Sequence, residues 1–121
     1  MNVLTVNMKR VHLFEAYIQE AMELQHLEIE YGIDLDLWNA GHYLDLSRIV
    51  IPKAKRGQGI GTQVMHLIIQ HAEQLNLPIF LTPSKDFGAT STSRLTKFYK
   101  GLGFEKNQNK GISKHQLVYY P

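Results

Sequence analysis

The chain has 121 residues, 44% of them hydrophobic and 20% charged, which is the composition of one globular domain over residues 1–121. It contains no cysteine, which excludes disulfides, thiolate metal sites and cysteine nucleophiles, and its net charge of +2 is too small to indicate a nucleic-acid partner. No apolar run approaches the roughly 20 residues of a membrane-spanning helix, and the N-terminus lacks a signal-peptide pattern, so we expect a cytoplasmic protein.

The first part of the chain predicts a helix followed by a hairpin. Apolar residues at near-helical spacing predict an amphipathic helix over residues 11–30. Residues 33–37 alternate apolar with polar, as a half-buried strand does, and Asn39-Ala40-Gly41 is typical of a turn. Residues 42–51 predict the second strand, and its last three residues are all apolar, so we expect them to be buried on both faces.

The second part predicts a parallel strand pair. An apolar stripe at helical spacing runs from about residue 60 to residue 74, where Asn76 and Pro78 oppose its continuation. The apolar residues 78–82 then predict a short strand, and a strand, helix, strand order implies a right-handed crossover between parallel strands. The remaining predicted elements are a loop at residues 86–93, a helix at 93–100 and a closing hairpin of strands at 104–106 and 115–120.

A glycine-rich loop lies between the second predicted strand and the long helix. It reads Arg56-Gly57-Gln58-Gly59-Ile60-Gly61 and is followed by Thr62. The start of a helix has unpartnered N–H groups at the positive end of its dipole, which suits a phosphate, and glycine lets a ligand approach the backbone. The loop is not a P-loop, because no Lys-Ser or Lys-Thr follows its last glycine, and positions 62 and 64 break the GxGxxG pattern.

What remains is Arg-x-x-Gly-x-Gly at Arg56, Gly59 and Gly61, which resembles the coenzyme A pyrophosphate loop of the GNAT superfamily of N-acetyltransferases. The stretch Lys97-Phe98-Tyr99-Lys100-Gly101-Leu102-Gly103-Phe104 resembles the Phe-Tyr-x-x-x-Gly-Phe that ends the last helix of these proteins. The order of elements matches the family from about residue 43, and the region before it is shorter than usual. The resemblance implies an α+β fold with a mixed, mostly antiparallel sheet that contains a splayed parallel strand pair and is flanked by helices.

The resemblance also implies a function and a set of cofactor contacts. The chain would bind acetyl-coenzyme A and pass the acetyl group directly to an amine in a ternary complex. Backbone amides from Arg56 to Thr62 would hold the pyrophosphate, and the strand edge at Ile49, Val50 and Ile51 would bond the pantetheine arm. Many family members have an asparagine where this chain has Thr92, whose hydroxyl does not reproduce an amide but can bond the cofactor or cap a helix at Ser93.

Two ionisable positions are candidates for the chemistry. Tyr99 stands where the family commonly has a tyrosine that protonates the departing thiolate, and a phenol with a pKa of about 10 can donate to a thiolate whose pKa is about 8.5. Counting back from the loop without gaps, Asp45 stands where histone acetyltransferases carry a catalytic glutamate. The alternatives are that Tyr99 only fills the core and that Asp45 is solvated or paired with Arg48.

Other assignments stay open. His42, Glu28, Glu30 and water are further candidates for the general base, since positioning alone supplies much of the rate. Arg94 either reaches the coenzyme phosphates or is a solvated helix charge. We expect no metal site. The C-terminal strand either pairs with another strand of the same chain or forms an edge contact between the two chains of a homodimer.

The charges of the chain are unevenly distributed. Residues 1–47 carry eight acidic and two basic side chains, and residues 48–121 carry three acidic and eleven basic ones. The acidic half favours a cationic acceptor, such as a protein lysine, a protein N-terminus or a small polyamine. One competing hypothesis is a coenzyme A-binding or protein-interaction module of the same fold without turnover. The other is a nucleic-acid-binding domain that would use Lys53, Lys55, Arg56, Lys110 and Lys114. The aromatic residues do not form a stacking motif, which disfavours this hypothesis.

Overall fold

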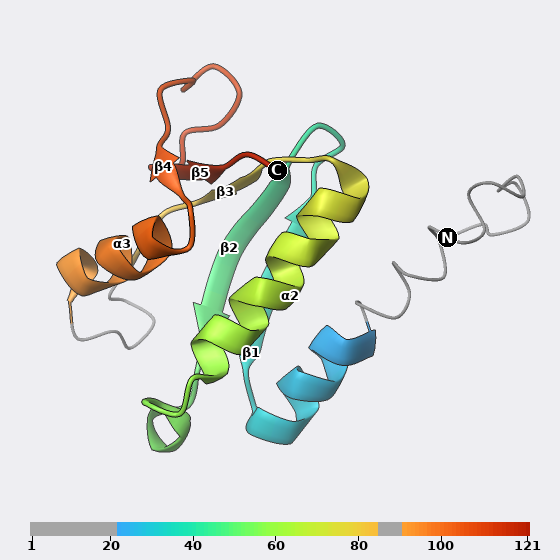
Figure 1. Ribbon diagram of the computed structural model, residues 1–121, viewed down its shortest axis with the longest axis vertical. Coiled ribbons are helices and arrows are strands. Elements are labelled where there is room, and N and C mark those ends of the chain that lie inside the picture. The colour runs from blue at the N-terminus through green and yellow to red at the C-terminus, as the bar shows by residue number, and fades with distance from the viewer. Residues whose placement is uncertain (1–21, 85–90) are drawn as a thin grey trace, which may run out of the picture.

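The computed structural model describes residues 22–84 and 91–121 (Figure 1). Its elements are a helix at residues 22–31, β1 (Asp34–Asn39), β2 (Leu44–Val50), the 3₁₀ turn η2 (Lys53–Lys55), α2 (Ile60–Leu75), β3 (Ile79–Leu81), α3 (Thr92–Gly101), β4 (Glu105–Lys106) and β5 (Leu117–Tyr119). The first half of the predicted N-terminal helix and most of the predicted loop at residues 86–93 lie outside the described residues.

The five strands form one mixed sheet in the order β1-β2-β3-β5-β4. Among these strands only β2 and β3 run parallel, because α2 carries the chain across between them, and all other neighbours are antiparallel. The predicted crossover and the α+β fold are therefore confirmed. The C-terminal strand β5 lies between β3 and β4, so it forms internal pairs.

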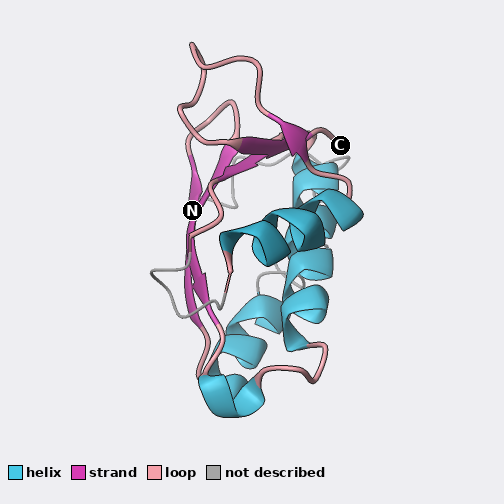
Figure 2. Ribbon diagram, turned by 90° about the vertical axis from the view of Figure 1, so that its left-hand side faces the viewer, coloured by secondary structure: helices cyan, strands magenta, loops and turns pink. Residues whose placement is uncertain are grey.

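The helices of the described residues all cover one face of this sheet (Figure 2). Leu44 and Leu46 of β2 belong to the same buried cluster as Val64, Met65 and Ile68 of α2, so the predicted apolar stripe is the core face of that helix. Burial of each such side chain contributes roughly 1.5–3 kcal/mol. Among the described residues, no helix combines the length and the apolar character that crossing a bilayer requires.

Two local predictions were wrong. Residues 49–51 are half-buried instead of buried on both faces, because the pairing of β3 with β2 ends at Leu46 and Leu81 and the helices cover one face only. Helix α3 begins at Thr92, not at Ser93, because the Ser91 hydroxyl caps it by accepting the Arg94 backbone N–H at 3.3 Å.

Candidate active site

The parallel strands β2 and β3 separate at their carboxyl ends. Their three paired positions end at Leu46 and Leu81, whereas β2 continues to Val50. Asp36 of β1 pairs with Arg48 and the next residue of β1 pairs with Leu46, so Ser47 is an extra residue that bulges from β2. Beyond Leu46 the main chain of β2 therefore has β1 on one side and, within the described residues, no strand on the other.

A hollow occupies this separation. Its lining consists of residues 46–49 of β2, residues 81–84 at the end of β3, and Leu95 and Tyr99 of α3. The hollow thus combines an unpaired strand edge with polar side chains, among them Ser47 and Thr82. Ile49, one of the residues assigned to the pantetheine arm, lies in this lining, while Val50 pairs with Asp34 of β1.

Tyr99 is held in the hollow by aromatic packing. Its ring is edge-on to Phe98 at 5.2 Å and to Phe104 at 5.6 Å between ring centroids, and the residue is only 5% exposed. Burial raises the pKa of its phenol to about 12 because the charged phenolate is poorly solvated there. Tyr99 therefore keeps its proton at neutral pH and can act as a hydrogen-bond donor or an acid.

The glycine-rich loop opens helix α2 close to the carboxyl end of β2. Gly57 and Gly59 have φ angles of +78° and +77°, a conformation that costs an L residue roughly 1–2 kcal/mol. The first N–H groups of α2 have no acceptor within the helix. Gly59 is the N-cap, and because it has no side chain it cannot accept a hydrogen bond from them either. In the described part of the chain, the backbone N–H groups of residues 57–59 also donate to no carbonyl. These amides are available to an anion.

The glycine-rich loop is tied to the end of β2 by two further contacts. Arg56 donates from Nε to the Ile51 carbonyl oxygen at 3.0 Å. A Cβ atom on Gly61 would lie 3.1 Å from Ile51 Cδ1, so glycine at this position allows α2 to pack closely on the residue that follows β2. The exposed side chains of Lys53 and Lys55 lie on η2 beside the same loop.

Asp45 is part of a hydrogen-bonded chain of side chains. Leu44 and Leu46 face the helices, so Asp45 between them faces the opposite side of the sheet. Asp45 Oδ1 lies 2.9 Å from His115 Nε2, and His115 Nδ1 lies 2.8 Å from Thr82 Oγ1. The proposed pairing of Asp45 with Arg48 was wrong, because Arg48 Nε instead makes an ion contact with Asp34 Oδ2 at 3.0 Å.

His115 and Thr82 are residues that sequence reasoning missed. His115 is far from Asp45 in the chain and reaches it because β5 lies beside β3, next to β2. The sequence offers only a weak signal, which is a threonine immediately after the buried strand β3.

The other candidate bases do not line the hollow. The pKa of Glu28 is raised by partial burial and, to a lesser extent, by the charge of Asp34. Glu30 pairs with His26 at 3.0 Å, and His42 is exposed in the turn between β1 and β2.

Thr92 and Arg94 lie in the first turn of α3, where both are exposed. The part of α3 that lines the hollow is its next turn, through Leu95 and Tyr99. Contacts of Thr92 and Arg94 with a cofactor therefore stay a prediction.

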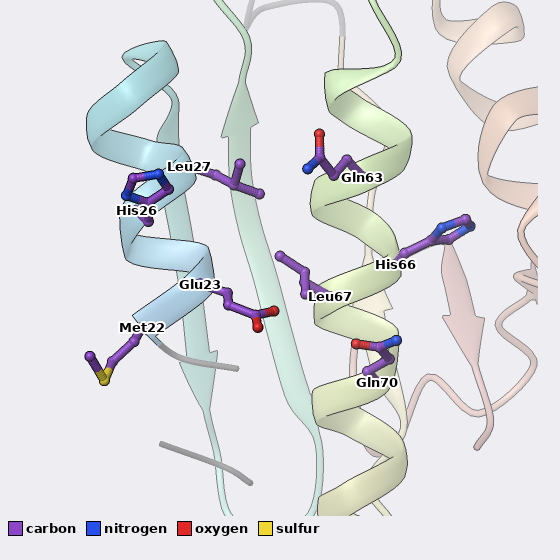
Figure 3. A pocket seen from close by; sticks show the side chains of 8 residues that line it. All are labelled: Met22, Glu23, His26, Leu27, Gln63, His66, Leu67 and Gln70. Atoms are coloured by element: carbon purple, nitrogen blue, oxygen red, sulfur yellow. The ribbon is translucent and has the colours of Figure 1, made fainter. Parts of the chain in front are cut away.

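A second hollow lies between the helix at residues 22–31 and α2 (Figure 3). Its lining consists of Met22, Glu23, His26, Leu27, Gln63, His66, Leu67 and Gln70. Leu27 and Leu67 point toward one another across it, while His66 points to the far side of α2 (Figure 3). Its polar groups do not converge on one point, and within residues 22–84 and 91–121 no three His, Asp or Glu side chains are placed to hold a metal ion.

Comparisons with known proteins agree with this geometry. The family model described as "Acetyltransferase (GNAT) domain" matches residues 38–119. The crystal structure of the anti-CRISPR protein AcrVA5 is similar, with a TM-score of 0.57 and 19% sequence identity over 72% of this chain and 88% of that chain. At this identity the likeness concerns the fold. A search of curated proteins found no match.

Proposed function

Because the chain belongs to the GNAT acetyltransferase domain family, we propose that it is an N-acetyltransferase that moves an acetyl group from acetyl-coenzyme A to a primary amine. The family implies acetyl-coenzyme A as the co-substrate. The amine acceptor is carried by a protein lysine, a protein N-terminus or a small polyamine-like molecule.

The observation that carries this proposal is the joint position of three features. The unpaired edge of β2, the buried phenol of Tyr99 and the free amides that open α2 all lie at the carboxyl end of one strand. In the proposed complex the pyrophosphate lies on the amides from Gly57 to Thr62, with Gln58 and Ile60 contributing main-chain N–H groups. The Arg56 N–H, which was assigned to the same site, instead donates to the Lys53 carbonyl oxygen at 3.4 Å. The pantetheine arm then follows residues 49–51 into the hollow, with Thr92 and Arg94 beside it.

The proposed chemistry is direct attack on the thioester. The amine nitrogen bonds to the carbonyl carbon and negative charge develops on the carbonyl oxygen, where main-chain N–H groups of the open β2 edge stabilise it. Breaking of the C–S bond then produces a thiolate, and Tyr99 donates its proton to that sulfur. Asp45 acts on the acceptor side, where its carboxylate favours removal of the proton that the attacking amine must lose.

The decisive experiment has a binding arm and a turnover arm. Calorimetry with acetyl-coenzyme A tests the cofactor site, and mass spectrometry of a cell extract incubated with protein and acetyl-coenzyme A identifies the acetylated products. We expect Tyr99→Phe to bind the cofactor normally but to transfer acetyl groups at least about 100-fold more slowly, since general acids typically contribute 10²–10⁴-fold. Tyr120→Phe is the matched control, because Tyr120 is 53% exposed.

The outcomes separate the competing functions. Cofactor binding with acetylated amines as products supports the proposal. Binding without any transfer to protein or small amines would instead identify a coenzyme A-binding module of this fold. Absence of cofactor binding, together with salt-sensitive binding to nucleic acid, would refute the enzymatic interpretation altogether.

A further inference from the structure

We propose that Thr82, His115 and Asp45 form a proton relay that accepts the proton of the attacking amine, with His115 as the group that finally holds it. The inference rests on the proposed N-acetyltransferase function, and it assigns the general base of that reaction. Thr82 is the catalytic residue that contacts the amine. His115 and Asp45 act through it.

The relay is assembled from three segments that are distant in sequence. Thr82 directly follows β3, His115 precedes β5 and Asp45 lies in β2. The sheet order places these three strands side by side. Consecutive polar atoms lie 2.8 and 2.9 Å apart, from Thr82 Oγ1 to His115 Nδ1 and from His115 Nε2 to Asp45 Oδ1.

The partners of each group determine the direction of every hydrogen bond. An ionised carboxylate only accepts, so His115 Nε2 carries a hydrogen and donates it to Asp45. The Gln116 backbone N–H donates to Thr82 Oγ1 at 3.1 Å, which leaves the Thr82 hydroxyl hydrogen free to point at His115 Nδ1. Nδ1 is then the unprotonated nitrogen of a neutral ring. It is already in contact with the hydroxyl from which it would take a proton.

The relay connects two hollows. Thr82 lines the hollow between β2 and β3 together with Ser47 and Tyr99, where the thioester is proposed to lie. Asp45 and His115 line a different hollow with Tyr43 and residues 110–114. Their side chains are only 24% and 21% exposed, so the ion pair that they form after proton uptake is partly shielded from solvent and stabilised more than a surface pair.

The proton transfer balances. As the nitrogen–carbon bond forms, one N–H bond of the amine breaks and its proton goes to Thr82 Oγ1. The original hydroxyl proton of Thr82 passes to His115 Nδ1, and the resulting imidazolium is paired with the Asp45 carboxylate. The proton then leaves to solvent through the second hollow, which returns the ring to its neutral form. Tyr99 separately protonates the thiolate and is reprotonated from solvent.

Direct action of Asp45 as the base agrees less well with these contacts. Asp45 Oδ1 already accepts hydrogen bonds from Ser47 Oγ and from His115, both at 2.9 Å. Asp45 also does not line the hollow that holds Thr82 and Tyr99. The other charged groups near His115 are Lys110, whose Nζ donates to the His115 carbonyl oxygen at 2.9 Å, and Lys114. Both lysines carry positive charge, and Asp45 is the carboxylate in direct contact with the ring.

The kinetic test uses two matched pairs of variants, with spermidine and a lysine-containing peptide as amines. His115→Gln keeps a donor for Asp45 but cannot take up a proton, and we expect kcat/KM for the amine to fall about 100-fold or more while KM for acetyl-coenzyme A is unchanged. His66→Gln, at an exposed position of α2, should leave both values unchanged. Thr82→Val should match the loss of His115→Gln, and Thr82→Ser should retain most of the activity.

A second readout does not depend on the acceptor. ¹⁵N NMR of the histidine rings in the full chain should show His115 with its hydrogen on Nε2 and a bare Nδ1, and Thr82→Val should shift the Nδ1 resonance while His66→Gln should not. A hydrogen on Nδ1 would overturn the relay. So would full activity of His115→Gln, or an acetyl group on Thr82 found by mass spectrometry, since that would make Thr82 a nucleophile. If the wild-type protein acetylates neither amine, the proposed function is in question while the NMR result still decides whether the relay exists.

Discussion

Replacing Tyr99 with phenylalanine should change how the stability of the protein depends on pH. The variant loses one buried hydroxyl and keeps the aromatic packing on Phe98 and Phe104. Burial raises the pKa of Tyr99 from 10.0 to about 12 in the folded protein. Between these values the unfolded chain releases the phenol proton while the folded chain retains it. The free energy of unfolding of the wild-type protein therefore falls as pH rises through this window.

The size of the effect follows from the pKa difference. One pKa unit corresponds to about 1.4 kcal/mol, so by pH 11 the wild-type protein should lose about 1.4 kcal/mol relative to Tyr99→Phe. By pH 12 the relative loss should approach roughly 2–3 kcal/mol. Below pH 9 the difference in stability between the two proteins should be constant, because the phenol is neutral in both the folded and the unfolded chain.

Urea unfolding followed by circular dichroism between pH 8 and pH 11 measures this difference. Tyr120→Phe is the control, since the exposed Tyr120 meets solvent in both states. Tyrosinate absorbance of wild-type and Tyr99→Phe protein gives an independent titration of the same hydroxyl. If the two proteins lose stability in parallel up to pH 11, burial does not hold the phenol protonated. The physical argument for Tyr99 as the acid would then fail.

Three further predictions concern the loop, the core and a helix cap. Gly59→Ala places an L residue at a φ of +77°, so we expect a loss of roughly 1–2 kcal/mol and weaker acetyl-coenzyme A binding by calorimetry. Gly101→Ala, where a Cβ atom meets nothing within 4 Å, should lack both effects, and equal behaviour of the two variants would contradict the role of the loop conformation. Burial lowers the pKa of His71, so below about pH 6.5 the unfolded chain binds a proton more readily than the folded chain does. The free energy of unfolding therefore falls as the pH drops through this range. Urea unfolding at pH 7.5 and pH 5 should show a smaller fall for His71→Gln, and an unchanged fall would refute this explanation. Ser91→Ala removes the cap of α3 and should cost about 1 kcal/mol in thermal denaturation, whereas Ser91→Asp should restore it.

Much of the fold follows from local patterns in the sequence. The apolar stripe of α2, the short apolar strand after it and the glycines between β2 and α2 each determine an element through period or turn chemistry, which depends on neighbouring residues only. The strand, helix, strand order then determines the parallel pair, because only a crossover connects such strands. These are the parts of the candidate site that sequence alone predicts.

Other features depend on which strands become neighbours, and no local pattern carries that information. Asp45, Thr82 and His115 meet because β5 inserts between β3 and β4 and so brings His115, two residues before β5, close to β2. The half-buried state of residues 49–51 likewise follows from where β3 stops pairing, and not from their apolar side chains. Hydrogen-bond partners and the depth of burial are properties of packed neighbours distant in the chain. The sequence by itself therefore determined the glycine-rich start of α2 and the helix that carries Tyr99, and the tertiary structure alone decided the partners of Asp45.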